Sequence, residues 1–168
     1  MAHSLRQAKV TQFAAGTMVV AMRKEPSLLL LTQNNETFMR PADYETATDI
    51  GAKGAIEEGE TPRKAALREL KEEAGLTLKL EQQFEAKDTH EFDVLHPVTM
   101  ERQERIRKSV VYFLAFAKES DIRAIKLSPE HISYEVVPIS KAIGLLKYEG
   151  QKKVVRKLAL HLKKLRKR

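Results

Sequence analysis

The sequence predicts a single α/β domain over residues 1–168, and its length, its composition and its mixture of strand and helix patterns carry this prediction. A chain of 168 residues is the size of one ordinary domain and buries roughly two-thirds of its unfolded surface on folding. Hydrophobic residues make up 42% of the chain and charged residues 32%, with only 7 Gly and 6 Pro. This composition excludes collagen-like, low-complexity and wholly disordered proteins.

The absence of cysteine and of a long apolar segment narrows the class of protein further. Without Cys, the chain has no disulfides, thiolate metal sites or cysteine nucleophiles, so oxygen or imidazole must hold any metal ion. The apolar run at 10–22 has 13 residues, fewer than the roughly 18 to 20 that a transmembrane helix needs. We therefore expect a cytoplasmic protein with no transmembrane segment.

The first elements are predicted to be strands. Residues 11–22 mix β-branched and apolar residues without helical spacing, and residues 28–31 form a short aliphatic run after a turn at Pro26. Both patterns are typical of buried strands. A loop with Pro41 follows, and the alternating Thr residues of 44–50 predict an edge strand.

A helix is predicted over residues 62–74. Thr61 is a suitable N-cap, Pro62 takes the favoured first position and Gly75 provides a left-handed C-cap. Its apolar residues recur at helical spacing, so one side of the helix faces the core. They are Ala66, Leu67, Leu70 and Ala74.

The second half of the chain contains further strands and two helices. Alternating or β-rich patterns predict strands over 76–84, 109–116 and 132–137. The charged segment between the first two, 86–107, has no clear period and is expected to form a long loop or an irregular hairpin. Helices over 140–147 and 152–165, separated by Gly150, complete the elements.

Three carboxylates share one face of the predicted helix at 62–74. Glu69, Glu72 and Glu73 stand three and four residues apart, where each pair of like charges destabilises a helix by a few tenths of a kcal/mol. Their clustering therefore suggests a compensating cation. Carboxylate oxygens without thiolates suit Mg²⁺ or Mn²⁺. On these residues alone, an exposed helix face with salt bridges is the alternative.

The surrounding residues resemble the Nudix hydrolase box. Gly54 is followed by five residues and Glu60, then by seven residues and the run RELKEEAGL at 68–76. A chance match to this pattern is on the order of 10⁻⁹ per start position. The resemblance implies an α/β/α sandwich with a curved mixed β-sheet, in which the box holds divalent cations against a diphosphate.

The resemblance also implies roles for the box residues. Glu69, Glu72 and Glu73 are the implied side-chain ligands of Mg²⁺ or Mn²⁺, and the Gly54 carbonyl is an implied backbone ligand. Glycine suits this position because it has no Cβ, so its backbone can approach closely. Metal ions would neutralise the substrate oxygens and position the attacking water.

Arg68 and the general base complete the implied site. Arg68 either pairs with Glu60 or Glu72 and orients the carboxylates, or takes part in catalysis itself. One carboxylate must accept the proton of the attacking water. We predict that Glu69 is this base, with Glu130 in a later loop as the alternative.

Two segments of the second half resemble the diadenosine tetraphosphate hydrolase branch of this family. They are KSVVYFLA at 108–115 and LSPEHISY at 127–134. The resemblance implies that Lys108 binds a phosphate and that Tyr134 lies near a base, and it makes Lys53, next to Gly54, a further substrate ligand. The alternatives are a solvated strand end for Lys108 and a packing role for Tyr134.

The chain departs from that branch at two places. Gly51 and Ala52 stand where members often have two prolines, and Val136 stands where they often have Trp. Base stacking is therefore weaker than in the branch, or Phe92 or Phe38 supplies it. His131 lies in the second segment and is interpreted as a loop residue that forms hydrogen bonds.

The net charge of +7 is concentrated at the C-terminal end. Nine of the 30 Lys and Arg residues and none of the 23 acids lie in 151–168, which leaves 21 basic residues against 23 acids elsewhere. An amphipathic basic helix is predicted at about 151–166. Its other face either is solvated or contacts a polyanion such as RNA, polyphosphate or an anionic membrane. Its apolar stripe consists of Val154, Val155, Leu158, Leu162 and Leu165.

These observations together predict a Mg²⁺-dependent pyrophosphohydrolase. A dinucleoside polyphosphate such as diadenosine tetraphosphate is the expected substrate. One alternative is a diphosphoinositol polyphosphate or capped-RNA pyrophosphatase, which a basic helix would also suit. A second is a non-catalytic module of the same fold that binds a nucleotide or RNA.

Overall fold

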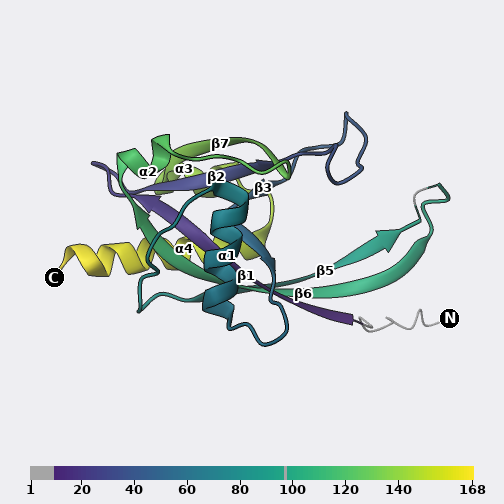
Figure 1. The fold of residues 1–168 in the computed structure, drawn as a ribbon, viewed down its shortest axis with the longest axis horizontal. Coiled ribbons are helices and arrows are strands. Elements are labelled where there is room, and N and C mark those ends of the chain that lie inside the picture. Colours follow the sequence, from purple (N-terminus) through teal and green to yellow (C-terminus); the bar gives the residue numbers. More distant parts are fainter. Residues whose placement is uncertain (1–9, 97) are drawn as a thin grey trace.

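The computed structural model describes residues 10–96 and 98–168 and contains seven strands and four helices (Figure 1). The prediction of one domain over 1–168 stays a prediction, because residues 1–9 and 97 lie outside the described residues. In chain order the elements are β1 (Val10–Ala21), β2 (Ser27–Gln33), β3 (Thr48–Asp49), β4 (Ala52–Ala55), α1 (Pro62–Ala74), β5 (Ala86–Leu95), β6 (Arg102–Ala117), α2 (Glu119–Arg123), β7 (His131–Pro138), α3 (Ile139–Leu145) and α4 (Glu149–Arg166).

A mixed sheet of seven strands forms the centre of the molecule. The strand order is β3-β2-β1-β6-β5, with β4 paired to β1 and β7 paired to β2. β1 and β6 run parallel, and the other pairs are antiparallel. β1 is the central strand, because β6 follows one of its edges while β4 and β2 share the other.

The two faces of this sheet are covered by different helices. In β1, Met18 and Val20 pack in the core cluster that includes residues of α3 and α4. Val19 and Ala21, which point the other way, pack in the cluster that includes α1. Figure 1 shows α1 and α4 on opposite sides of the sheet. The predicted α/β/α sandwich with a curved mixed sheet is therefore confirmed.

Local signals in the sequence set both ends of α1. Thr61 Oγ1 accepts a hydrogen bond from the Lys64 backbone N–H at 3.2 Å, Pro62 is the first helical residue, and Gly75 has a φ of 68°. All three match the prediction. The predicted apolar stripe is wrong at one residue: Leu67 is exposed, and Ala65 takes its place in the core.

Two predictions between α1 and β6 differ from the structure. The strand predicted at 76–84 is absent apart from a single bridge between Leu80 and Ala115. Its alternating apolar residues are nevertheless buried, because the segment packs on the sheet as an irregular chain. The segment 86–107 forms the long β5–β6 hairpin, with a register shift at Val94/Leu95. This outcome agrees with the irregular hairpin rather than the long loop.

Smaller differences occur elsewhere in the fold. Of the edge strand predicted at 44–50, only Thr48–Asp49 forms a strand, and β4 and α2 were not predicted. α4 begins at Glu149 and includes Gly150, which was expected to separate the last two helices. A Cβ at this glycine would collide with the Asp88 carboxylate, so close packing explains why glycine stands there. No helix of the described residues is long and apolar enough to cross a bilayer.

Candidate active site

A cavity of about 420 Å³ lies where α1 meets β4 and the loop before β7. Most of the predicted site residues lie around it, although they come from three separate parts of the chain. The lining residues are Lys53, Gly54, Ala55, Glu69, Glu72, Glu73, Ser128 and Glu130.

Gly54 allows the backbone of β4 to approach α1 closely. It pairs with Ala15 of the central strand, and a Cβ at this position would collide with the Glu69 carboxylate. Only a residue without a Cβ leaves room for that carboxylate. The expectation that Gly54 permits a close approach at the box therefore agrees with the structure.

Arg68 holds the carboxylates of the cavity in place. Its Nε and Nη2 donate to the two oxygens of Glu60 at 2.9 and 3.0 Å. Its Nη1 donates to Glu69 at 2.7 Å and to Glu72 at 3.3 Å, and its Nη2 also donates to the Ala55 carbonyl at 2.9 Å. The bonds with Glu60 and then Glu69 raise the pKa of Arg68 above its usual value. Both predicted pairings, with Glu60 and with Glu72, are present.

Glu73 and Glu130 place two carboxyl groups close together in the cavity. Glu73 is 5% exposed, and the backbone N–H of Lys53 donates to its Oε2 at 3.1 Å. Burial, together with the neighbouring Glu130, raises the pKa of Glu73 to about 9. Burial also raises the pKa of Glu69, although Arg68 opposes this effect. Such carboxyl groups gain most from a nearby positive charge.

The donor set of the cavity fits a hard divalent cation. The available ligands are carboxylate and carbonyl oxygens, which Mg²⁺ and Mn²⁺ prefer, and the space left by Gly54 admits the Glu69 carboxylate. Among the described residues, no three acidic or histidine side chains already stand close enough together to hold an ion. The ligand roles of Gly54, Glu69, Glu72 and Glu73 therefore stay a prediction.

Lys53 points from the cavity toward a buried aspartate. Its Nζ lies 3.1 Å from Asp49 Oδ1. Burial alone would lower the pKa of Lys53, but the attraction of Asp49, with Glu73 and Glu130 nearby, raises it. Asp49 also accepts from Gln33, and its Oδ2 lies 2.9 Å from Nε2 of the buried His131. His131 therefore forms a hydrogen bond, as predicted, but its predicted place in a loop is wrong, because it is the first residue of β7.

Lys108 and Tyr134 do not lie on the same face of the sheet. Lys108 pairs with Gln12 of β1 and shares the face covered by α3 and α4. Burial lowers the pKa of Lys108, and the charge of Lys53 lowers it further. Tyr134 pairs with Leu31, which packs on the side of α1. Because directly paired residues point to one face, a single group bound flat against the sheet cannot touch both.

Phe92 lies on the same face as Lys108. It pairs with Ile106, two residues before Lys108 along β6, and its exposed fraction is 38%. Residues two apart in a strand share a face, so an aromatic ring is available beside this lysine. Phe38, the other aromatic alternative, contacts the Arg40 guanidinium instead, at 4.9 Å from the ring centroid.

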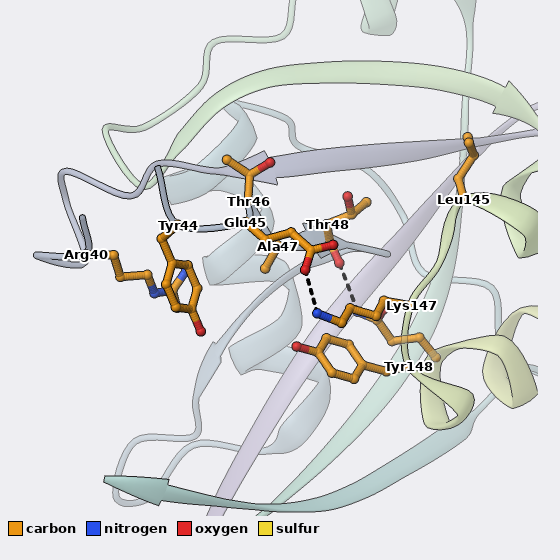
Figure 2. Close-up of a pocket in the computed structure, with 10 residues that line it drawn as sticks. Arg40, Tyr44, Glu45, Thr46, Ala47, Thr48, Leu145, Lys147 and Tyr148 are labelled. Carbon is orange, nitrogen blue, oxygen red and sulfur yellow. Dashed lines mark hydrogen bonds and ion pairs between the residues drawn. The ribbon is translucent and has the colours of Figure 1, made fainter. Parts of the chain in front are cut away.

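A second cavity, of about 330 Å³, lies between residues 40–48 and the start of α4. Figure 2 shows Tyr44 and Tyr148 on either side of it. An ion pair of 2.6 Å between Lys147 and Glu45 crosses one end of the cavity, and the Arg40 guanidinium lies 5.5 Å from the centroid of the Tyr44 ring. The cavity therefore offers two aromatic faces and charged groups of both signs.

Comparison with known proteins identifies the family. The family model for the NUDIX domain matches residues 11–158. This chain belongs to the Nudix family. The asymmetrical bis(5'-nucleosyl)-tetraphosphatase of Sus scrofa is 32% identical to this Nudix chain over 106 residues, which cover 61% of the chain and 64% of that relative. The chain thus matches less than two-thirds of this relative's length.

Solved structures support the Nudix fold. An Ap4A hydrolase of C. elegans in a binary complex superposes with a TM-score of 0.66 at 24% identity, over 90% of this chain and 97% of that protein. A MutT protein of Methanosarcina mazei superposes with a TM-score of 0.64 at 20% identity, over 95% and 99% of the two chains. At these identities the likeness shows the fold alone.

Asp49, Tyr44 and Tyr148 of this Nudix protein are not among the residues predicted from the sequence. Asp49 carried a usable signal, because aspartate is depleted in strands and this residue lies inside the predicted edge strand 44–50. Tyr44 and Tyr148 carried none, because exposed tyrosines in loops are common and only the fold brings these two to one cavity.

Proposed function

We propose that this Nudix chain is a Mg²⁺-dependent pyrophosphohydrolase. The observation that carries the proposal is the single cavity shared by Glu69, Glu72, Glu73 and the distant Glu130. The three box acids and the Gly54 carbonyl would hold the metal. A bound divalent cation would supply charge neutralisation at the phosphate oxygens and a more acidic water.

The residues of the chain would divide the remaining tasks. Arg68 would keep Glu69 and Glu72 oriented, since it donates to both. Glu69 is the proposed acceptor of the proton from the attacking water, and Glu130, which lines the same cavity, is the alternative. A general base must lie within hydrogen-bonding reach of that water, and both candidates meet this requirement for a water inside the cavity.

We further propose a dinucleoside polyphosphate, such as diadenosine tetraphosphate, as the substrate. The name of the Sus scrofa relative supports this choice. Lys53 and Lys108 would bind phosphate oxygens, and Phe92, on the face of Lys108, would stack on a base. The second cavity, with Tyr44 and Tyr148 (Figure 2), is a proposed site for a nucleobase. Tyr134, on the sheet face that α1 covers, is the proposed contact of a base on the side of the acidic cavity.

A substrate panel tests the proposal. Diadenosine tetraphosphate, a diphosphoinositol polyphosphate and a capped RNA are incubated with the protein and Mg²⁺, and the products are separated by chromatography. We expect the dinucleotide to be cleaved with the highest kcat/KM. Phe92→Ala and Tyr148→Ala should each raise its KM about tenfold, because stacking on an aromatic ring contributes about 1–3 kcal/mol per base. Faster cleavage of the inositol compound would contradict the proposed dinucleotide substrate. If no compound is cleaved, the proposed hydrolase activity is wrong.

A second proposal concerns the outer face of α4. Four exposed lysines on this side make no ion pair with any other described residue: Lys153, Lys163 and Lys164 of α4, and Lys167, its C-cap residue. At 100° per residue all four fall within an arc of about 100°. Leu160 is the one large apolar side chain exposed within α4, too little for insertion into a membrane. We propose that this lysine face binds the phosphate backbone of RNA.

A further inference from the structure

Asp49 has a buried carboxylate that contacts three other side chains. Its exposed fraction is 5%. Gln33 Nε2 donates to its oxygens at 3.0 and 3.1 Å, Lys53 Nζ lies 3.1 Å from Oδ1, and His131 Nε2 lies 2.9 Å from Oδ2. Burial alone would raise the pKa of Asp49, but Lys53 and then His131 hold it below its usual value. Three side chains therefore hold this carboxyl group in place.

Stability alone does not explain this arrangement. Removing two charges from water costs several kcal/mol per ion, and a well-packed apolar pair of similar volume is often as stable or more stable. An ion pair between the buried Asp49 and the partly buried Lys53 at the edge of a candidate active site therefore calls for a second reason.

The position of Lys53 supplies that reason. Its backbone N–H donates to Glu73 at 3.1 Å, and Lys53 lines the cavity together with Glu73 and Glu130. The flexible side chain thus starts from a point beside two carboxyl groups of the acidic cavity. If nothing held the ammonium elsewhere, these carboxyl groups would be its next partners, and it would take the position that a divalent cation needs.

We propose that Asp49 is a positioning residue that holds the Lys53 ammonium outside the acidic cavity and so keeps the carboxylates free for a divalent cation. This inference rests on the proposed function. In the observed position, Asp49 takes one of the three donors of Lys53, and the other two are available for a phosphate at the cavity rim. Gln33 and His131 keep the aspartate itself from turning.

Direct binding of Mn²⁺ to the protein tests this proposal without using activity. Free Mn²⁺ is measured by electron paramagnetic resonance in titrations of the wild type, Asp49→Asn, Lys53→Met and the double variant. Asp49→Asn should weaken binding about tenfold, in the range seen when residues that orient metal ligands are changed. Lys53→Met should bind at least as tightly as the wild type. In its presence, Asp49→Asn should change the affinity less than about twofold, because the competing ammonium is gone.

A matched control uses another buried aspartate of the same sheet. Asp88 of β5 is 7% exposed and makes no hydrogen bond or ion pair with Lys53. Asp88→Asn is therefore expected to leave the Mn²⁺ affinity unchanged within about twofold. An equal loss in Asp49→Asn with and without Lys53 would overturn the proposal, as would no loss in the single variant.

Two further outcomes keep the test decisive. Thermal unfolding of each variant shows whether it folds. If Asp49→Asn does not fold, Lys53→Met decides the question, because weaker Mn²⁺ binding in that variant contradicts a competing ammonium. If the wild type binds Mn²⁺ and the variants behave as expected, but no phosphoanhydride is cleaved, the proposed function fails while the positioning role of Asp49 holds.

Discussion

The acidic cavity beside α1 and the basic face of α4 hold their charges in opposite ways. Beside the cavity, the single side chain of Arg68 donates hydrogen bonds to Glu60 and to the cavity residues Glu69 and Glu72. On α4, the four lysines of the outer face extend into solvent without a described ion-pair partner. Fixed groups suit a ligand of defined geometry, whereas mobile ammonium groups suit a diffuse partner such as a phosphate backbone.

The largest expected effect comes from removing α4. Deleting residues 151–168 removes the buried side chains of Val154, Val155, Leu158 and Leu162. Burial of four such side chains is worth roughly 6–12 kcal/mol, comparable with the whole stability of about 5–15 kcal/mol for an ordinary domain. We expect the truncated chain to lose its cooperative thermal unfolding transition, measured by circular dichroism. A transition near that of the full chain would show that α4 is not part of the core.

In the cavity, the largest expected effect is on turnover. Glu72→Gln and Glu73→Gln should each lower kcat at least about a hundredfold, because the negative charge that would hold the metal is lost while the shape is kept. Glu58→Gln is the control, since Glu58 is exposed and lies outside the cavity lining. Hydrolysis of diadenosine tetraphosphate with Mg²⁺ gives the rates. Full activity in both cavity variants would contradict the assignment of the metal ligands.

The dependence of stability on pH gives a smaller effect. Without metal, burial and the neighbouring Glu130 raise the pKa of Glu73 from its ordinary 4.5 to about 9. The folded state therefore binds more protons than the unfolded state between these values, and stability falls as the pH rises through this range. Melting temperatures in EDTA should decrease from pH 5 to pH 9 more steeply for the wild type than for Glu73→Gln. Parallel curves for the two proteins would show that Glu73 ionises normally.

The sequence predicted best where local signals act alone. Thr61, Pro62 and Gly75 determine the ends of α1 within a few residues of themselves, and all three predictions hold. The charged strand β5 was predicted only as part of a long loop or an irregular hairpin, because its stabilising partners lie on β6. Glu91 accepts hydrogen bonds from Arg105 and Arg107, which lie 14 and 16 residues later in the chain. No period within 86–95 shows that pairing.

The residues of the candidate site also fall into two groups: those that local spacing in the sequence reveals, and those that only the fold brings together. The box residues could be found because their spacing on one helix is local. The distance between Asp49 and His131, 82 residues apart, arises only when β2 pairs with both β3 and β7. At 76–84, the alternation of apolar and polar residues predicted a strand that does not form. Leu80 and Phe84 are buried, but burial of an apolar side chain does not require a strand.

The smallest expected effect on stability concerns the outer face of α4. Changing its four lysines to Gln should alter the free energy of unfolding by less than about 0.5 kcal/mol, because surface residues without partners contribute little. Binding of a single-stranded RNA, measured by fluorescence anisotropy at several salt concentrations, should weaken. The slope of log affinity against log salt should fall by about 3, since each phosphate contact contributes about 0.7.

A second variant with four other exposed lysines changed to Gln keeps the same net charge as the first, and it should retain its RNA binding. The control positions are Lys24, Lys79, Lys87 and Lys141. Equal losses in the two variants would mean that net charge, rather than the face of α4, attracts the RNA, and binding only to anionic vesicles would replace RNA by a membrane surface.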